Sequence, residues 1–293
     1  MTTVDQLAHR FGIVLDPDSV SGGLSGSAVR RGTRADGTPA VVKIRFAESG
    51  FDRVAAEREL TFYRELAGDL GIKTPELLAH HQSDDCVAIL LSAPGTIRPA
   101  PDWTHDHWLA LAGDLAALHE TPVPDGGLWR HAPDGEVPGS DPDRWRSYWD
   151  RPGEAELFAP IFDDPGALTA AVRAQPFCFN HGDCHTDNIL ITEAGLVWAD
   201  WQVAGFGRPA GELAFAAGRA APSGATPPLA EIIKLYADRR GLDAAELARS
   251  VLAAELSTAL FAWPAYAGYN SSAGIDRVHG RAVDLARRWL TEV

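Results

Sequence analysis

The chain has 293 residues, of which 45% are hydrophobic and 23% are charged, so it can form one large globular domain or two smaller ones. Its formal net charge of −14 argues against nucleic acids and anionic membranes as partners, because both would repel the protein. The same charge suits a cationic small-molecule substrate, although acidity can also serve solubility alone.

The first twelve residues and the hydropathy pattern bear on location. Residues 1–12 contain an early acidic residue, Asp5, and lack the apolar core of a secretory signal. No uninterrupted apolar stretch approaches the roughly 18 residues that a membrane-spanning helix needs. We therefore expect a cytoplasmic protein without a membrane partner.

Three cysteines, Cys86, Cys178 and Cys184, are odd in number and form no CxxC pair, so no disulfide framework is expected. Cys178 and Cys184 are close in sequence to His181 and His185, a grouping that raises the question of zinc. The spacing matches no common zinc pattern, and the histidines have a better use in the motif described below.

The first third of the chain predicts strands and two helices. In chain order we expect a helix at residues 7–11, a Gly/Ser-rich turn at 21–32, a hairpin turn at 36–37, a strand at 40–46, an amphipathic helix at 51–67, a strand at 86–92 and a breaker at 93–95. A lysine at position 43 interrupts the otherwise apolar strand 40–46.

The remainder is mostly helical in pattern. We expect a helix at 106–119 capped by Thr104, a Pro/Gly-rich loop at 122–142, a strand at 177–179, a hairpin of strands 189–191 and 196–199, and helices at 228–239, 244–263 and 275–291. A strand-rich third followed by helices predicts an α+β protein with a ligand cleft between its two parts.

The polar run HGDCHTDN (residues 181–188), followed by ADWQ (residues 199–202), is the most informative part of the chain. Phosphoryl transfer needs positioning, a base and cations on the phosphate charge. Asp183 and Asn188 have the spacing at which a catalytic-loop Asp accepts the substrate proton while an Asn holds a metal. Asp200 follows the second hairpin strand, where its carboxylate can join Asn188 in binding Mg²⁺.

The alternative interpretation is a polar turn whose side chains hydrogen-bond to the loop backbone. For His181 and His185 this is the better interpretation, and we expect both to hold the shape of the loop. For Asp183, Asn188 and Asp200 together, residue type, order and spacing favour phosphoryl transfer.

These motifs resemble those of the aminoglycoside phosphotransferase and choline-kinase superfamily, relatives of the protein kinases. The family's HGDxHxxN motif is complete at residues 181–188, its downstream acidic motif stands at 200–202, and its L-A-x-L-H helix end stands at 115–119. Its D-L-A motif departs to Glu212-Leu213-Ala214, which keeps the charge and leaves the contact open. The resemblance extends over about residues 22–215.

The resemblance implies a two-lobed protein-kinase-like fold. A small antiparallel-sheet N-lobe, residues 1–94, would bind the nucleotide. A larger, mainly helical C-lobe, residues 95–293, would carry catalysis and substrate binding.

The resemblance also implies roles for N-terminal residues. Lys43 would contact the α- and β-phosphates of ATP or GTP, with Glu59 as its ion-pair partner and Glu57 as the competing choice. A lysine in an apolar strand is costly to bury unpaired, so a partner is expected on physical grounds as well. Further nucleotide contacts would come from a phosphate loop and from backbone at the purine edge: Gly22, Gly23, Ser25, Gly26 and Ser27 in the first case, and Leu91, Ser92 and Ala93 in the second.

Two further groups of residues are weaker candidates. The run His105-Asp106-His107 resembles a metal site but is better explained as the polar first turn of a helix. Aromatic residues of the helical part are core residues by default, although some are candidates to wall the acceptor pocket. The candidates for acceptor binding are Glu255, Trp263, Tyr266 and Asp276.

The leading hypothesis is a Mg²⁺-dependent kinase that moves the γ-phosphoryl of ATP or GTP onto a hydroxyl of a small, amino-bearing molecule, with Asp183 as the base. An aminoglycoside or aminocyclitol antibiotic and an amino sugar fit this description. The second hypothesis is a housekeeping kinase for choline, ethanolamine, homoserine or a sugar.

A third hypothesis, a nucleotide-binding pseudokinase, would require a broken Asp183, Asn188, Asp200 or Lys43, and all four are intact. A protein kinase is disfavoured, because the chain after Asp200 leaves no room for an activation segment ending in A-P-E. The sequence leaves the acceptor, the choice of ATP or GTP and the oligomeric state open.

Overall fold

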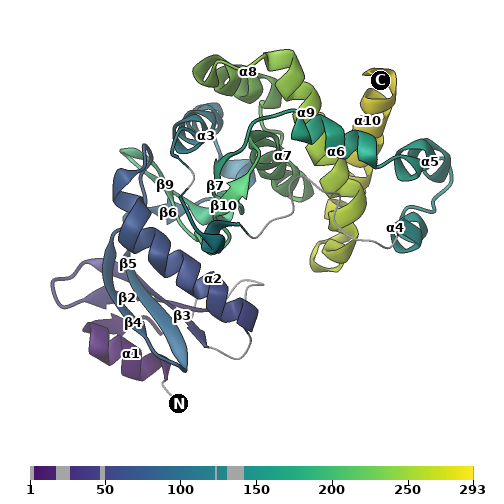
Figure 1. Cartoon of the computed structure of the whole chain (residues 1–293). Coiled ribbons are helices and arrows are strands. Elements are labelled where there is room, and N and C mark those ends of the chain that lie inside the picture. Colours follow the sequence, from purple (N-terminus) through teal and green to yellow (C-terminus); the bar gives the residue numbers. More distant parts are fainter. Residues whose placement is uncertain (1–2, 18–26, 47–49, 123, 131–141, 293) are drawn as a thin grey trace. The chain divides into compact units, whose positions relative to one another are not determined.

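The computed structural model describes residues 3–17, 27–46, 50–122, 124–130 and 142–292 (Figure 1). The chain divides into two compact units, each assembled from separate stretches of sequence. Unit 1 comprises residues 1–97, 126–129 and 188–204, and unit 2 comprises residues 98–125, 130–187 and 205–293.

Unit 1 is built on a five-stranded antiparallel sheet with the strand order β1-β2-β3-β5-β4. The strands are β1 (Ile13–Leu15), β2 (Ala28–Arg34), β3 (Pro39–Phe46), β4 (Leu77–Gln82) and β5 (Cys86–Ser92). The helices are α1 (Val4–Phe11) and α2 (Gly50–Thr61), and α2 continues into the π-helical turn η1 (Phe62–Leu66) and the 3₁₀ turn η2 (Ala67–Asp69). The hairpin turn between β2 and β3 has Gly37 at φ +83°, a conformation that favours glycine.

Alternate residues of β3 face opposite sides of the sheet, which separates the apolar core from the charged site. Ala40, Val42 and Ile44 are buried in a core cluster with Leu7 of α1. Lys43 has the opposite parity and lies on the face that α2 contacts. The apolar stretch AVVKI therefore delivers one charged side chain, that of Lys43, to the face of the sheet that α2 contacts.

A second small sheet completes unit 1. It consists of β6 (Thr96–Ile97), β8 (Ile189–Thr192) and β9 (Gly195–Trp198), all antiparallel, and η4 (Gly127–Trp129) belongs to the same unit. The hairpin is joined to the rest of the unit because the Trp198 N–H donates to the Lys73 carbonyl at 2.8 Å. The expected hairpin at 189–199 is thus confirmed.

Unit 2 is mainly helical. Its α-helices are α3 (His105–Leu118), α4 (Pro142–Tyr148), α5 (Ala155–Asp163), α6 (Gly166–Arg173), α7 (Pro209–Ala220), α8 (Leu229–Arg240), α9 (Ala244–Ser257) and α10 (Ser272–Glu292). The shorter elements are the antiparallel pair β7 (Cys178–Asn180) and β10 (Gly205–Gly207), and the turns η3 (Ala100–Asp102), η5 (Thr186–Asn188, which ends in unit 1), η6 (Ala221–Ser223), η7 (Thr258–Ala262), η8 (Trp263–Ala265) and η9 (Ala267–Tyr269). Helix α9 packs against α6 and α7, and α3 packs against α8 (Figure 1).

The expected fold class is confirmed: an antiparallel sheet is followed by a mainly helical region, in a kinase-like fold. Thr104 caps α3 as expected, with its side chain accepting the His107 N–H at 3.3 Å. The run at residues 105–107 is accordingly the first turn of α3. The assignment of residues 1–94 to nucleotide binding and 95–293 to catalysis stays a prediction.

Several elements differ from expectation. Strands β1, β4, β6 and β10 and helices α4, α5 and α6 were not predicted from the sequence. Strand β2 begins at Ala28, so the turn expected over residues 21–32 is wrong from that residue on. The helix expected over 244–263 is α-helical only to Ser257 and then passes through the π-helical η7 into a 3₁₀ turn that contains Pro264. Proline lacks a backbone N–H donor, so a regular α-helix cannot continue through this position unchanged.

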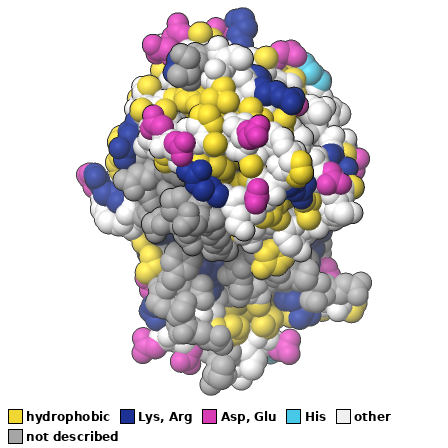
Figure 2. Space-filling model, turned by 90° about the vertical axis from the view of Figure 1, so that its right-hand side faces the viewer, with side chains coloured by type: hydrophobic (Ala, Val, Ile, Leu, Met, Phe, Trp, Pro, Cys, Tyr) yellow, Lys and Arg dark blue, Asp and Glu magenta, His cyan; other side chains and the backbone are white. Residues whose placement is uncertain are grey.

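No helix among the described residues is long and apolar enough to cross a membrane. Figure 2 shows one face of the molecule, on which acidic and basic side chains are interspersed. The net charge of −14 is therefore not gathered into an acidic patch on the part of that face that the structure describes.

Candidate active site

Lys43 is held by two carboxylates within unit 1. Its Nζ lies 2.7 Å from Glu59 Oε2 on α2 and 2.7 Å from Asp200 Oδ1, just beyond β9. The side chains of Lys43, Glu59 and Asp200 are 10%, 4% and 27% exposed. Glu57, the competing candidate, instead pairs with Arg53 at 2.8 Å. The lysine is thus a fixed ammonium between α2 and the end of the hairpin.

The ionisation of this triad follows from burial and charge. Burial lowers the pKa of Lys43, but the charges of Glu59 and Asp200 outweigh burial and raise it above the ordinary value. Burial raises the pKa of Glu59, and the ammonium of Lys43 opposes this rise. Lys43 is therefore charged at neutral pH.

Asn188 and Asp200 lie at the same end of the β8–β9 hairpin. The Ala199 N–H donates to the Asn188 carbonyl at 2.9 Å, one step beyond the strand ladder. Asp200 has φ +67°, an unfavourable conformation for a non-glycine residue that persists only where the surroundings hold it. The side chains offer an amide oxygen and carboxylate oxygens, and the Lys43 pair uses only Oδ1. This donor chemistry fits the divalent cation that the sequence predicts.

A buried carboxylate holds the start of the HGDCHTDN loop in unit 2. Glu212, in the first turn of α7, accepts the His181 N–H at 3.0 Å, the Gly182 N–H at 2.7 Å and a bond from His119 Nε2 at 3.2 Å. Burial opposes the charge of Glu212, but these neighbours outweigh burial and lower its pKa. His119 also bonds the Tyr236 hydroxyl at 2.7 Å. The sequence left open what the glutamate of the Glu212-Leu213-Ala214 motif contacts. In the structure it contacts the backbone at the start of the 181–188 loop.

Asp183 follows that anchored backbone and faces His185. The Asp183 N–H donates to His181 Nδ1 at 3.2 Å, so His181, which is fully buried, bonds within the loop. His185 Nε2 lies 3.5 Å from Asp183 Oδ1, and its Nδ1 lies 3.5 Å from Asp187 Oδ2. Burial lowers the pKa of His185, but the two carboxylates outweigh burial and raise it to about 9. His185 thus pairs with the carboxylate that is predicted to be the base.

The two cysteines of this region are buried thiols. Cys178 Sγ donates to Asn180 Oδ1 at 3.0 Å, and Cys184 is fully buried beside Asp183 in the sequence. Burial raises the pKa of both thiols, so they stay protonated at neutral pH.

Residues 18–269 match the phosphotransferase enzyme family (APH), a span that includes Lys43, the 181–188 run and Asp200. The chain belongs to this family. The protein is accordingly a small-molecule kinase, and the resemblance read from its motifs is confirmed.

Solved structures of phosphotransferases share the fold at low sequence identity. A microcompartment-associated aminopropanol kinase is 17% identical with a TM-score of 0.70, and the match covers 99% of this chain and 97% of that one. An amicoumacin kinase in complex with AMP-PNP and Ca²⁺ is 13% identical with a TM-score of 0.60, over 93% and 88% of the two chains. An ethanolamine kinase from Plasmodium vivax is 12% identical with a TM-score of 0.60, over 95% and 84%. No curated protein sequence matches the chain.

Of the residues predicted to form the phosphate loop, the structure describes only Ser27. Gly22, Gly23, Ser25 and Gly26 lie outside the described residues. The Ser27 hydroxyl is buried and accepts the Arg45 Nε–H at 2.9 Å, so any phosphate contact from Ser27 is left to its backbone.

The predicted purine edge lies at the end of β5. The Ser92 N–H donates to the Glu76 carbonyl at 2.9 Å, and the Ala93 N–H donates to the Pro39 carbonyl at 3.3 Å. Leu91 pairs with Val41 in the sheet. A purine contact at these positions would therefore use carbonyl groups rather than the amides of Ser92 and Ala93, and it stays a prediction.

The four candidates for acceptor binding in this family member divide into buried and exposed residues. Glu255 is buried and bonded through Oε1 to Arg281, and burial outweighs this arginine and raises the pKa of Glu255. Trp263 is also buried, whereas Tyr266 is 52% exposed and Asp276 is exposed. Tyr266 and Asp276 remain the better candidates.

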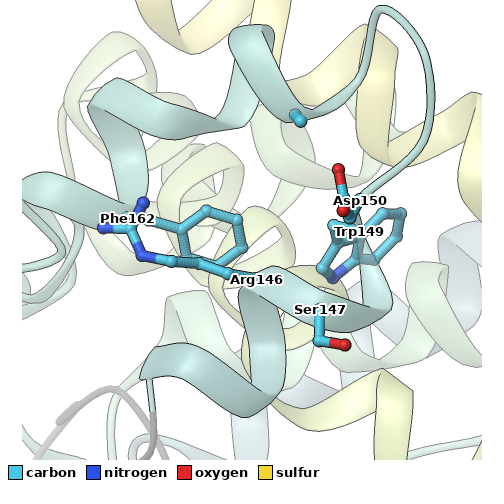
Figure 3. Close-up of a pocket in the computed structure, with 6 residues that line it drawn as sticks. Arg146, Ser147, Trp149, Asp150 and Phe162 are labelled. Carbon is cyan, nitrogen blue, oxygen red and sulfur yellow. The ribbon is translucent and has the colours of Figure 1, made fainter.

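A pocket of about 250 Å³ in unit 2 has none of Glu255, Trp263, Tyr266 and Asp276 in its lining (Figure 3). Its lining is Arg146, Ser147, Trp149, Asp150, Ala155 and Phe162. The Arg146 guanidinium lies over the Phe162 ring at 5.4 Å and pairs with Asp163 at 2.8 Å. These contacts explain the packing of α4 on α5 and indicate no chemistry.

The contacts that support the site were not predicted from the sequence. Arg45 and Arg58 had no expected role, and His119 had none beyond a motif match, because single basic residues in a strand or helix look like surface charges. The missed indication is the strand spacing: Arg45 lies two residues after Lys43, on the same face of β3. Helical spacing gives no such indication for Arg58, because it adjoins Glu59 directly.

Proposed function

We propose that this kinase transfers the γ-phosphoryl group of ATP or GTP to a hydroxyl of a small, amino-bearing molecule, such as an aminoglycoside or aminocyclitol antibiotic or an amino sugar. The observation that carries the proposal is the triad in unit 1, where Lys43 lies 2.7 Å from both Glu59 and Asp200. An ammonium fixed beside a carboxylate that suits a metal is the arrangement that phosphoryl transfer requires on the nucleotide side.

Each residue has a defined part in the proposed reaction. Lys43, oriented by Glu59, binds the α- and β-phosphates, and Asn188 and Asp200 hold the divalent cation. When bound, Mg²⁺ neutralises the negative charge on the phosphates. The acceptor oxygen forms a bond to the γ-phosphorus as the bond from that phosphorus to the bridging oxygen breaks, and ADP or GDP leaves. Asp183 takes the proton of the acceptor hydroxyl.

The arrangement around Asp183 supports its role as the base. Glu212 anchors the backbone at His181 and Gly182, and the Asp183 side chain that follows is 29% exposed. His185 Nε2 lies 3.5 Å from Asp183 Oδ1 and helps to orient this carboxylate. The amicoumacin kinase bound to AMP-PNP and Ca²⁺ supports an adenine nucleotide and a divalent cation in a related fold.

A second candidate is a housekeeping kinase for choline, ethanolamine, homoserine or a sugar. The aminopropanol and ethanolamine kinases among the solved structures favour small amino alcohols as one class to test. Their identities of 17% and 12% show the fold alone and do not choose the substrate. A pseudokinase is disfavoured, since the Lys43 ion pairs are intact.

A coupled assay of ADP and GDP release tests the proposal. Purified protein is supplied with ATP or GTP, Mg²⁺ and one acceptor at a time from aminoglycosides, peptide antibiotics, amino sugars and amino alcohols, with the Asp183→Ala protein as the blank. We expect turnover on an amine-bearing alcohol above the blank. Turnover on amino alcohols alone would favour the housekeeping kinase. Tight nucleotide binding without turnover on any acceptor would favour the pseudokinase.

A further inference from the structure

The two residues after Asp200 are fixed in the interior of unit 1. Trp201 is fully buried and stacks on Phe62 of η1, with ring centroids 3.9 Å apart and an interplanar angle of 9°. Its indole N–H donates to the Trp198 carbonyl at 2.9 Å. Gln202 is also buried. The chain segment that leaves Asp200 is therefore held against α2 and its π-helical continuation.

Arg58 on α2 provides the polar part of this anchor. The residue is 4% exposed; Nη1 donates to the Gln202 carbonyl at 2.6 Å and Nε donates to the Leu128 carbonyl at 2.8 Å. Burial lowers the pKa of Arg58. The buried guanidinium has lost hydration that the guanidinium of a surface arginine keeps, and this loss is unfavourable. The rigid fork of the guanidinium joins three chain segments that are far apart in sequence.

A second arginine, Arg45 of β3, also bonds Gln202. Arg45, 6% exposed, donates through Nη2 to Gln202 Oε1 and through Nε to Ser27 Oγ. Arg45 lies on the same face of β3 as Lys43. Gln202 is thus bonded by side chain to the strand that carries Lys43 and by main chain to the helix that carries Glu59.

The bonds to Gln202 bear on the conformation of Asp200. Asp200 has φ +67°, so its backbone must be held in place by the neighbouring residues of the turn. The carboxylate must at the same time stay near Lys43 on β3. The bonds from Arg58 and Arg45 to Gln202 can do both. They fix the chain two residues after Asp200 and use no oxygen of its carboxylate.

We propose that Arg58 is a positioning residue for metal binding: its bond to the Gln202 carbonyl holds the Asp200 turn against α2, so that the carboxylate is aimed before the cation arrives. This inference rests on the proposed function, in which Asp200 is a metal ligand. Because Arg58 and Glu59 are neighbours on α2, one helix then fixes the phosphate-binding ammonium and the metal-binding carboxylate together.

The test compares Arg58→Met with Arg53→Met. Arg53 is on the same helix, but it bonds Glu57 at 2.8 Å and the Asp84 carbonyl at 3.1 Å, away from the Asp200 turn. Binding of AMP-PNP or GMP-PNP, whichever the wild type binds, is measured by calorimetry at rising Mg²⁺ and separately in EDTA. A thermal melt of each variant reports folding.

We expect Arg58→Met to need about 10- to 100-fold more Mg²⁺ for half-maximal nucleotide affinity, with its affinity in EDTA unchanged. Arg53→Met should match the wild type. Arg58→Lys should fall between them, since an ammonium keeps the charge without the two-pronged geometry.

Unchanged Mg²⁺ dependence in a folded Arg58→Met protein would overturn the inference, as would an equal loss of affinity with and without Mg²⁺. Should Arg58→Met fail to fold, Arg58→Lys decides in the same assay: an unchanged Mg²⁺ requirement overturns the proposal and a raised one supports it. A wild type whose nucleotide binding is indifferent to Mg²⁺ would overturn the proposed role of Asp200 and this inference with it.

Discussion

Unit 1 and unit 2 hold their functional carboxylates in different ways. In unit 1 the carboxylate of Asp200 is itself bonded to a buried ammonium, and its backbone is strained. In unit 2 the fixed carboxylate is Glu212, which bonds the loop backbone, while Asp183 lies 3.5 Å from a histidine. A metal ligand benefits from a fixed side chain, whereas a base needs a fixed backbone and a side chain that can take a proton.

The largest expected effect tests the unit 2 half of this comparison. Asp183→Ala should lower the rate of transfer by about 10²- to 10⁴-fold, because it removes the proton acceptor. Nucleotide affinity should be unchanged, since the triad lies in unit 1. Turnover on an identified acceptor and calorimetric nucleotide binding check the two statements.

The matched control for this variant is Asp187→Ala, which removes the other carboxylate that faces His185 at 3.5 Å. It should keep most of the activity. Near-normal turnover in Asp183→Ala would show that the base has been assigned to the wrong residue.

The next effect concerns the stability of unit 1. Lys43→Met removes the ammonium that Glu59 and Asp200 share, and breaking a buried ion pair in this way costs about 3–5 kcal/mol. Asp200 is partly exposed, so the lower end of that range applies. Urea unfolding measures the loss.

Lys73→Met is its control, because the ammonium of exposed Lys73 bonds only the Ala194 carbonyl among its described contacts and should change stability by less than about 0.5 kcal/mol. Equal stability of the two variants would mean that the Lys43 triad is not a fixed structural element.

A smaller effect is expected at the anchor of unit 2. Glu212→Gln keeps the shape of the side chain but removes its charge, and hydrogen bonds to charged groups are worth about 1.5–3 kcal/mol. Hydrogen exchange at the amides of His181 and Gly182 should become faster, because both donate to this carboxylate. Unaltered exchange at these two amides would contradict the assigned contact. Glu231→Gln, at an exposed side chain of α8 that pairs with His105, serves as the control.

The smallest effect is a pH dependence. His185 has a folded-state pKa of about 9, above its ordinary value of about 6.5. Its contribution to stability is therefore complete below about pH 6.5 and is lost as the pH rises through about 9. The loss should be on the order of 1 kcal/mol, because the paired carboxylates are partly exposed. Urea midpoints across this range should fall less in His185→Gln than in the wild type, and parallel curves would show that the His185 pair does not contribute to stability.

Much of unit 1 was predictable because its signals are local. The alternation of AVVKI and the turn at Asp36-Gly37 predict a hairpin strand with one charged side chain. Strand β4 was not predictable in the same way, since LLAHHQ mixes apolar and polar residues, as suits an edge strand that is half-buried.

In unit 2, helix α5 was not predictable for a different reason. It contains Pro160, and a proline inside a segment normally argues against a helix.

The site was predictable to the level of its motifs and no further. Spacing brings out Asp183, Asn188 and Asp200, because those positions are set by one loop and one hairpin. Glu212 accepts two main-chain N–H groups besides its bond with His119, and Arg58 donates to main-chain carbonyls of distant segments. A main-chain N–H or carbonyl leaves no trace in the identity of a residue. Only the fold reveals that a Glu in α7 holds the loop ahead of Asp183.

The interleaved composition of unit 1 has a consequence for how the protein is made. Phe62 stacks on Trp201, and Arg58 bonds Gln202. Both contacts need residues 188–204, which come late in the chain. On the ribosome, the N-terminal sheet therefore emerges long before its last partners have been synthesised. A gene fragment that stops near residue 97 would encode a sheet with an uncovered aromatic ring and a guanidinium lacking both carbonyls, and we expect such a product to aggregate on expression.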